Sequence, residues 1–257
     1  MVIATIEFDG SSRQADLGRG TCLAIPLRDQ GRHPHFFVDE SARFTPLAAG
    51  SFSGRVKQGC SCNVDRVQFV PHCHGTHTEG VGHVLGDTRP VQQALSFELI
   101  PAALVSVTPT ADTQDTPAGI GPVIEESMLE LPPGIRAVVI RCLPNTTDKC
   151  TRRYDQAPPY PLLSVEAMDA IVEAGVEHLL IDTPSVDAAD DGGRLAQHRR
   201  FWGFVGALPS ATRTACTITE MIYVPDHLPD GLYLLSLGVS AIEGDASPSA
   251  PVLYPLS

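Results

Sequence analysis

The chain has 257 residues, of which 43% are hydrophobic and 19% are charged, a balance typical of a globular protein with one large core. We therefore predict a single domain over residues 1–257. The formal net charge of −12 argues against nucleic acid or an anionic membrane as a partner, because both are polyanions.

Two features of the sequence bear on where the protein is located: the lack of a recognisable targeting signal and the spacing of the cysteines. The chain contains no apolar run of about 18 residues, the length expected of a transmembrane helix. Its first residues carry no basic region of the kind that begins a signal peptide. The seven cysteines are irregularly spaced, which is typical of reduced thiols and not of a disulfide framework. We expect a cytoplasmic protein.

The first half of the chain predicts strands separated by long loops. Residues 1–8 alternate apolar and polar side chains and predict a strand, as do residues 64–70. Residues 95–107 are rich in apolar side chains and predict a buried strand or pair of strands. Residues 108–134 are rich in Thr, Pro, Asp and Gly and predict a loop with a short helix near 125–129.

The second half contains the clearest supersecondary signal. Residues 137–142 predict a buried strand. Ser164 is expected to cap a helix over 165–174, which Gly175 ends. A buried strand over 177–181 follows and terminates at the kind of strand edge where α/β proteins bind ligands. The remaining predicted elements are a helix over 193–204 and closing strands over 231–239 and 251–256.

Residues 71–83 read PHCHGTHTEGVGH and concentrate the reactive chemistry of the chain. They contain four of its nine histidines, one cysteine and one glutamate. Imidazole, thiolate and carboxylate groups bind divalent transition metals, and histidine also carries protons near neutral pH. The stretch predicts a metal site, and the alternative is a histidine-rich surface loop that binds nothing.

This segment is expected to be extended, because Gly75 and the β-branched Thr76 and Thr78 disfavour a helix. Side chains of an extended segment alternate between two faces. The predicted metal-facing side chains are Cys73, His77, Glu79 and His83. In this register His72 and His74 point the other way, unless a bulge at Gly75 shifts the alternation.

The segment from Cys73 to His83 resembles the core motif His-x-Gly-Thr-His-x-Asp-x-Pro-x-His of the cyclase-like metal-dependent hydrolases, which include bacterial kynurenine formamidase and isatin hydrolase. The resemblance implies that His77 is a metal ligand and that His83 is the catalytic acid/base. Cys73 and Glu79 occupy the positions of the family's first His and its Asp, so they are implied ligands with changed chemistry. Val81 replaces the usual Pro.

Two later stretches extend the resemblance. Residues 182–187, DTPSVD, look like the family's Asp-Thr-Pro-Ser-x-Asp stretch. His198 follows it and matches a histidine that serves as a metal ligand. Glu220, in the sequence TEMI, resembles the glutamate of a Glu-Asn-Leu segment, which supplies the remaining ligand. Residues 228–231 and 244–248 resemble the family's closing strands.

The resemblance implies an α/β fold of the swivelling β/β/α kind, with a mixed sheet and long loops. It also implies hydrolysis of a small amide or lactam, as in an arylformamidase, with metal-activated water and His83 as the proton carrier. A thiolate at Cys73 would favour Zn²⁺ over Mn²⁺ as the cofactor. The expected partners are a small-molecule substrate and a second copy of the chain, because the family is usually oligomeric.

Two other functions remain open at this point. The changed chemistry at Cys73 and Glu79 is compatible with a non-catalytic binding protein on the same scaffold. A lyase or cyclase acting on another carbonyl substrate is the third possibility. Phe201, Trp202 and Phe204 follow His198 closely and could line an aromatic pocket, although packing in the core is favoured for them.

Overall fold

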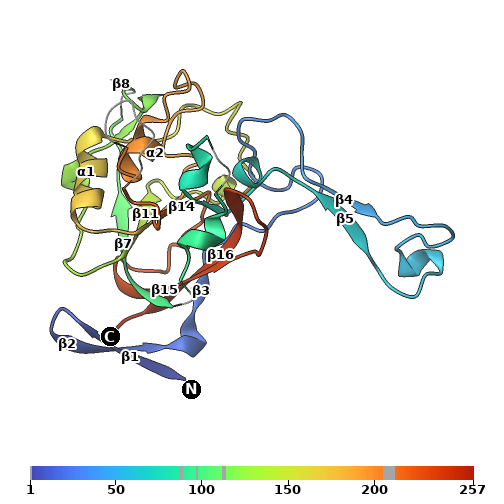
Figure 1. Ribbon diagram of the computed structural model, residues 1–257, viewed down its shortest axis with the longest axis horizontal. Helices are drawn as coiled ribbons and strands as arrows, with labels where there is room; N and C mark the ends of the chain where they lie inside the picture. Colours follow the sequence, from blue (N-terminus) through green and yellow to red (C-terminus); the bar gives the residue numbers. More distant parts are fainter. Residues whose placement is uncertain (1, 87–88, 97, 112–113, 205–211) are drawn as a thin grey trace.

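The computed structural model describes residues 2–86, 89–96, 98–111, 114–204 and 212–257. Its centre is a mixed sheet that closes on itself, because β15 pairs with both β7 and β16 (Figure 1). The strands around this ring are, in order, β15 (Gly231–Val239), β7 (Leu99–Val107), β11 (Ala137–Cys142), β13 (His178–Ile181), β14 (Thr217–Glu220), β6 (His77–Glu79) and β16 (Ala246–Pro255). An eighth strand, β3 (Thr21–Cys22), pairs with β16.

The strands β7, β11, β13 and β14 run parallel and form the buried part of the sheet. Every residue of β11 is buried, and all its side chains except that of Arg141 alternate between two apolar clusters on opposite faces. Val138 and Ile140 belong to one cluster, whereas Ala137 and Val139 belong to the other. A parallel strand covered on both faces requires such a continuous apolar run, and the strand predicted over 137–142 is confirmed.

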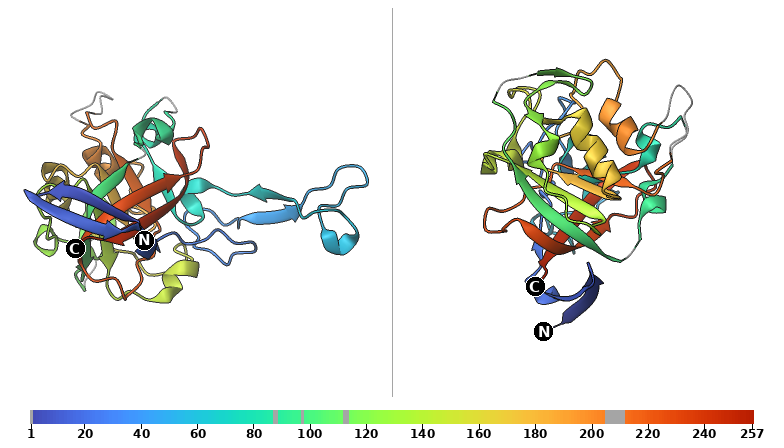
Figure 2. Two further views of the ribbon diagram at one scale, coloured as in Figure 1. Left: turned by 90° about the horizontal axis from the view of Figure 1, so that it is seen from below. Right: turned by 90° about the vertical axis from the view of Figure 1, so that its left-hand side faces the viewer.

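Two α-helices, α1 (Val165–Glu173) and α2 (Ala196–Phe201), lie together on one side of the sheet (Figure 2). The Ser164 hydroxyl accepts the Ala167 N–H at 3.0 Å, and Gly175 adopts a φ of 77° just after α1. The cap and the stop predicted for this helix are confirmed, whereas α2 is shorter than the predicted 193–204. No helix in the described part of the chain is long and apolar enough to cross a membrane.

Phe201 and Trp202 are fully buried in the apolar cluster between the helices and the sheet. Phe204 is only partly buried and packs against the same cluster. These aromatic side chains therefore serve the core, which is the favoured of the two interpretations, and a pocket must be lined by other residues.

The remaining elements are short and lie outside the ring of strands. The paired strands are β1 (Ile3–Phe8) with β2 (Ser11–Asp16), β4 (Arg43–Pro46) with β5 (Asp65–Gln68), β8 (Gln114–Thr116) with β9 (Gly119–Gly121), and β10 (Val123–Ile124) with β12 (Leu162–Leu163). The 3-10 helices are η1 (Leu17–Arg19), η2 (Val56–Gln58), η3 (Pro71–Cys73), η4 (Val81–His83), η5 (Val91–Ala94), η6 (Glu126–Met128) and η7 (Thr147–Thr151). The short helix predicted near 125–129 is thus the single turn η6. The α/β class, with a mixed sheet and long loops, is confirmed.

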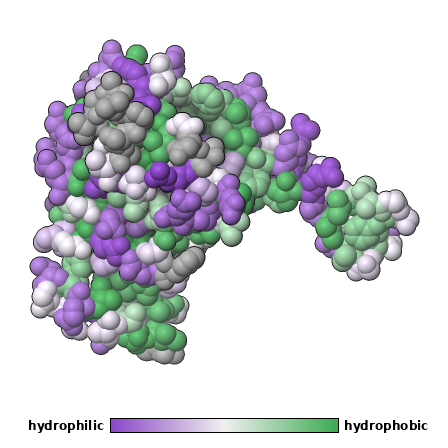
Figure 3. Space-filling model, in the orientation of Figure 1, coloured by the Kyte–Doolittle hydropathy of each residue, from purple (hydrophilic) through white to green (hydrophobic). Residues whose placement is uncertain are grey.

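Residues 43–68 form an arm that projects from the body (Figures 1 and 2). Its stem is the antiparallel pair β4 and β5, and its tip stands clear of the rest of the surface in the space-filling view (Figure 3). The strand predicted over 64–70 is present as β5. It leads into residues 71–83 as expected, but it pairs within the arm and not with the main sheet.

Candidate functional site

The register of two neighbouring strands, β6 and β14, brings the first acidic and imidazole groups together. His77 and Glu79 are two residues apart in β6, so their side chains lie on the same face. In the antiparallel neighbour β14, Glu220 is directly opposite His77, and residues opposite each other share a face. Nε2 of His77 accordingly lies 3.4 Å from Oε2 of Glu220.

His198 reaches the same place from the first turn of α2. The Asp187 carboxylate accepts the backbone N–H groups of Gln197 and His198 at 3.0–3.1 Å, which satisfies the start of the helix. It also accepts a hydrogen bond from Nδ1 of His198 at 2.7 Å. The other ring nitrogen, Nε2, lies 3.0 Å from Oε1 of Glu79 and 3.7 Å from Oε1 of Glu220. Asp187 therefore orients the imidazole toward the two glutamates.

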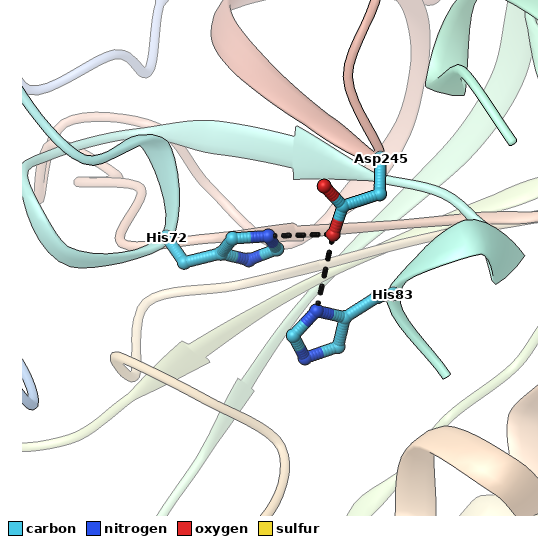
Figure 4. A group of neighbouring side chains, drawn as sticks. All are labelled: His72, His83 and Asp245. Atoms are coloured by element: carbon cyan, nitrogen blue, oxygen red, sulfur yellow. Dashed lines mark hydrogen bonds and ion pairs between the residues drawn. The ribbon is translucent and has the colours of Figure 1, made fainter. Parts of the chain in front are cut away.

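His72 and His83 complete the group on its more open side. Nδ1 of His72 lies 3.0 Å from Oε2 of Glu79, and Nε2 of His83 lies 3.9 Å from the same oxygen. The other nitrogens of both rings turn toward Asp245, Nε2 of His72 at 2.9 Å and Nδ1 of His83 at 3.3 Å (Figure 4). Both imidazoles are 25% exposed, whereas Glu79 is fully buried.

The alternation expected over residues 73–83 does not hold, because only His77–Glu79 is extended. The 3-10 turn η3 precedes it, and Gly75 adopts a left-handed φ of 88°. The turn presents His72 to the glutamates, and Cys73 belongs to none of the potential metal-binding groups of the described residues. Burial, with a smaller effect of the Glu40 charge, raises the pKa of the Cys73 thiol to about 11.

His74 also turns away from this site. It packs edge-on against His33 and His35. Its Nδ1 accepts the Val70 N–H at 2.9 Å and its Nε2 donates to the Glu40 carbonyl at 2.8 Å. Both ring nitrogens are used in these bonds, so His74 has no lone pair to offer a ligand.

The remaining lone pairs of the site suit a metal ion. Nδ1 of His77 donates to the Gly75 carbonyl at 3.1 Å, which leaves Nε2 without a proton. Apart from the imidazole contacts given above, Nε2 of His77 and both oxygens of Glu79 have no hydrogen-bond partner among the described residues. A carboxylate this buried is costly unless a cation compensates it. Converging imidazole nitrogens and carboxylate oxygens are donors that divalent transition metals accept.

The pKa values of these groups reflect the same compensation. Burial lowers the pKa of His198, but the charge of Glu79 and the bonds to Asp187 and Glu79 outweigh it and raise the pKa well above its usual value. Burial lowers the pKa of His72 too, yet its bonds to Asp245 and Glu79 raise it to about 10. For Glu79, burial is outweighed by the charges of His83 and His198, which hold its pKa well below normal. Protons and a metal ion would thus compete for the same nitrogens.

A cavity of about 620 Å³ opens above the cluster. The residues that line its floor are His72, Cys73, Glu79, His83, His198 and Glu220. Its walls are mostly apolar, from Phe36, Phe37, Val38, Val70, Ala188 and Leu195, with Asp190 and Asp191 at one side. None of the described residues that line it is a lysine or an arginine. The cavity is large enough for a small organic molecule, and histidines are the only basic side chains among the described residues that line it.

Phe37 has an uncommon backbone conformation at this cavity. Its φ is 65° and its side chain is 72% exposed. The Val38 N–H donates to the Phe36 carbonyl at 2.7 Å, which closes a three-residue turn around Phe37. Phe36 is anchored by its ring contact with Tyr160, at 5.9 Å between ring centres. A bulky residue in the left-handed region is strained, so the turn displays Phe37 at a conformational cost.

The predicted site residues are thus brought together except for Cys73: His77, Glu79, His198 and Glu220 converge, and His83 lies beside them. Sequence reasoning missed His72, Asp187 and Asp245. Asp187 lies in the DTPSVD stretch but had no assigned role, because nothing in the sequence shows that the start of α2 turns His198 back toward it. Asp182 of that stretch forms a buried ion pair with Lys149 at 2.7 Å and does not face the cavity.

Known proteins resemble this chain in sequence and in fold. The family described as "Putative cyclase" matches residues 21–188. The kynurenine formamidase of Bacillus cytotoxicus is 31% identical over 97 residues, which are 37% of this chain and 41% of that protein. The chain thus matches less than half the length of this relative.

Solved structures show the same fold at low identity. An isatin hydrolase bound to the product analogue thioisatinate superposes with a TM-score of 0.61 at 15% identity, covering 93% of this chain and 94% of the other. A "predicted metal-dependent hydrolase" of Bacillus stearothermophilus superposes with a TM-score of 0.60 at 14% identity, covering 92% and 98%. With the family match spanning well over half of its residues, the chain belongs to the cyclase family.

Proposed function

We propose that the protein is a metal-dependent hydrolase of a small amide or lactam, similar to an arylformamidase. The observation that carries this proposal is the convergence of imidazole nitrogens of His77 and His198 on the buried Glu79 carboxylate, beside a mostly apolar cavity that Glu79 and His198 line. Similarity to a kynurenine formamidase and to an isatin hydrolase supports this class of reaction.

We propose that His77, Glu79, His198 and Glu220 hold a divalent ion, either zinc or manganese. Imidazole and carboxylate donors accept both metals, and the preference for zinc rested on a thiolate from Cys73. When bound, such an ion lowers the pKa of water toward neutrality and polarises a carbonyl group. The bond from Asp187 to His198 would fix the ligand nitrogen, as a second carboxylate commonly does for a ligating histidine.

His83 is the proposed proton carrier. Its Nδ1 donates to Asp245, so its Nε2 is free to accept a proton and faces the cavity floor. The oxygen of water adds to the substrate carbonyl carbon, and the bond from that carbon to nitrogen breaks. His83 takes the proton from the water and passes it to the departing nitrogen. The apolar side chains of Phe36 and Val70 would pack against the organic part of the substrate.

The direct test is hydrolysis of isatin and N-formylkynurenine by the protein loaded with zinc or with manganese, followed by ultraviolet absorbance. We expect turnover of at least one compound, and its loss on treatment with a chelator. Glu79→Gln is the matched variant, because it preserves size and removes the buried charge. If the metal-loaded protein hydrolyses neither compound, the amide and lactam assignment is wrong, and binding of either without turnover favours the non-catalytic function.

A further inference from the structure

The turn before β6 directs the side chain of His72, and not that of the adjacent Cys73, toward Glu79. In the family motif the first metal-binding position corresponds to residue 73, which is a cysteine in this chain. In the structure Nδ1 of His72 lies 3.0 Å from Glu79, and its ring centre lies 5.3 Å from that of His77. The Cys73 backbone instead serves the cavity wall, because its carbonyl accepts the Phe36 N–H at 3.1 Å. An imidazole therefore replaces the missing one from the neighbouring position.

Asp245 contacts both histidines on the open side of the cluster through a single oxygen. Its Oδ2 accepts from Nε2 of His72 and from Nδ1 of His83 (Figure 4). A neutral imidazole carries one proton, so a bond donated from one nitrogen leaves a lone pair on the other. The same carboxylate thus leaves the lone pair of His72 on Nδ1, 3.0 Å from Glu79, and that of His83 on Nε2, which is further from Glu79, at 3.9 Å, in the lining of the cavity.

The backbone around Asp245 is fixed by the strand that carries the site. Its carbonyl accepts the Gly80 N–H at 2.9 Å, and the next residue, Ala246, pairs with Glu79 across β16 and β6. The position of this carboxylate relative to Glu79 is therefore set by sheet register and not by a free loop.

We propose that His72 is the metal-holding residue in place of position 73, and that Asp245 is the positioning residue that orients His72 toward the ion and His83 toward the substrate. This inference rests on the proposed metal site. It extends that site by one imidazole and one carboxylate that the motif does not predict. A carboxylate behind a ligating histidine typically contributes about 10- to 100-fold to metal affinity.

The sharpest test is the absorption spectrum of the wild-type protein loaded with Co²⁺, which needs no variant. A thiolate ligand gives an intense near-ultraviolet charge-transfer band to cobalt, whereas imidazole and carboxylate ligands do not. We expect no such band. A band in the wild-type protein that disappears in Cys73→Ser would identify Cys73 as the ligand and overturn the assignment of His72.

Metal affinities of variants, measured with zinc against a chromogenic chelator, test the two residues separately. We expect His72→Asn to lose the metal, Cys73→Ser to retain it, and Asp245→Asn to weaken it by about 10- to 100-fold. Asp190→Asn, which removes an equal charge from the rim of the same cavity, should leave the affinity unchanged, and Asp245→Glu should restore part of it. Wild-type affinity in His72→Asn or in Asp245→Asn overturns the role of that residue.

Metal content separates the failure of this inference from failure of the proposed function. If the wild-type protein binds neither zinc, manganese nor cobalt, the metal site itself is wrong and both proposals fall. If it binds metal but His72→Asn binds equally well, only the present assignment fails. If Asp245→Asn loses one of two bound ions outright, Asp245 is a ligand and not a positioning residue.

Discussion

Nδ1 of His198 donates to the Asp187 carboxylate at 2.7 Å, while Nε2 of the same ring lies 3.0 Å from Glu79. One aspartate thereby fixes both the start of α2 and the orientation of an imidazole that faces the cluster. The two functions can be separated experimentally, because the side-chain oxygen of asparagine can still accept the N–H groups at the start of α2 but carries no charge.

Asp187→Asn should therefore spare the helix and weaken the metal site. We expect the dissociation constant for zinc to rise by about 10- to 100-fold, since the imidazole loses its charged partner. Competition with a chelating dye measures this constant, and circular dichroism checks that the helix is intact. Unchanged zinc affinity in a folded variant would show that Asp187 does not support a ligand.

His83→Ala should lower turnover by about 10²- to 10⁴-fold, the usual contribution of a general acid/base, with metal content close to that of the wild type. His227→Ala is the matched control, because His227 is exposed and lies outside the residues that line the cavity. Loss of the metal together with the activity would make His83 a ligand. Full activity in the variant would exclude it from the mechanism.

The lack of a lysine or arginine in the described cavity lining predicts a preference for uncharged substrates. We expect kcat/KM for formanilide to exceed that for 2-formamidobenzoate by about 10-fold or more, because Asp190 repels the added carboxylate and no lysine or arginine of the described lining offsets this repulsion. Asp190→Asn should narrow this difference. An equal or reversed preference would indicate that the metal, or another chain, binds the carboxylate.

Two substitutions of Phe37 separate the strain of its backbone from the contact that its ring would make with a substrate. Phe37→Ala and Phe37→Gly both remove the ring, but only glycine relieves a φ of 65°. We expect the glycine variant to be more stable than the alanine variant by about 1 kcal/mol, as measured by urea unfolding. The KM for an aryl amide should rise equally in both. A KM unchanged from wild type would remove Phe37 from substrate binding.

His178 should make the protein sensitive to acid. It is 2% exposed, its Nδ1 bonds to the Thr217 hydroxyl at 2.9 Å, and burial lowers its pKa from 6.5 to about 4 despite the nearby charge of Glu177. Arg136 lowers it further and Glu98 raises it. Between these values the unfolded chain binds the extra proton, so the free energy of unfolding falls as the pH drops from about 6.5 to 4.

His178→Asn should reduce this dependence, because asparagine can bond to Thr217 but does not titrate. Urea unfolding at pH 7 and pH 5 measures the change for each protein, and the difference between the two proteins isolates His178 from the carboxylates. An identical loss of stability in the variant would show that other groups cause the acid sensitivity.

Local signals in the sequence predicted the elements well. The strand at 137–142 and the helix capped by Ser164 depend on apolar runs and on a hydrogen bond within three residues, so a short window contains their cause. The pairing of β15 with β16, which closes the ring, joins residues whose partners no local pattern specifies. The arm could not be predicted for the same reason. Alternation of apolar and polar residues identifies β5 as a strand but does not show that β4 is its partner.

The site was predictable where strand geometry governs it. His77 and Glu79 share a face because they are two residues apart in a true strand. Cys73 was misplaced because the turn η3 and the left-handed Gly75 interrupt the alternation. Asp245 lies in the stretch that resembles the family's closing strands, but no motif gives it a role, because it is 173 residues from His72 and meets it only through the register of β16 on β6.

The position of β6 within the closed ring has a consequence for motion. This strand bonds to β14 on one edge and to β16 on the other, so His77 and Glu79 have no free strand edge beside them. Backbone amides in such a strand exchange with solvent only when the surrounding sheet opens. His77 and Glu79, two of the proposed metal ligands, should therefore be among the slowest-exchanging positions of the chain, and their spacing should persist until the whole protein unfolds.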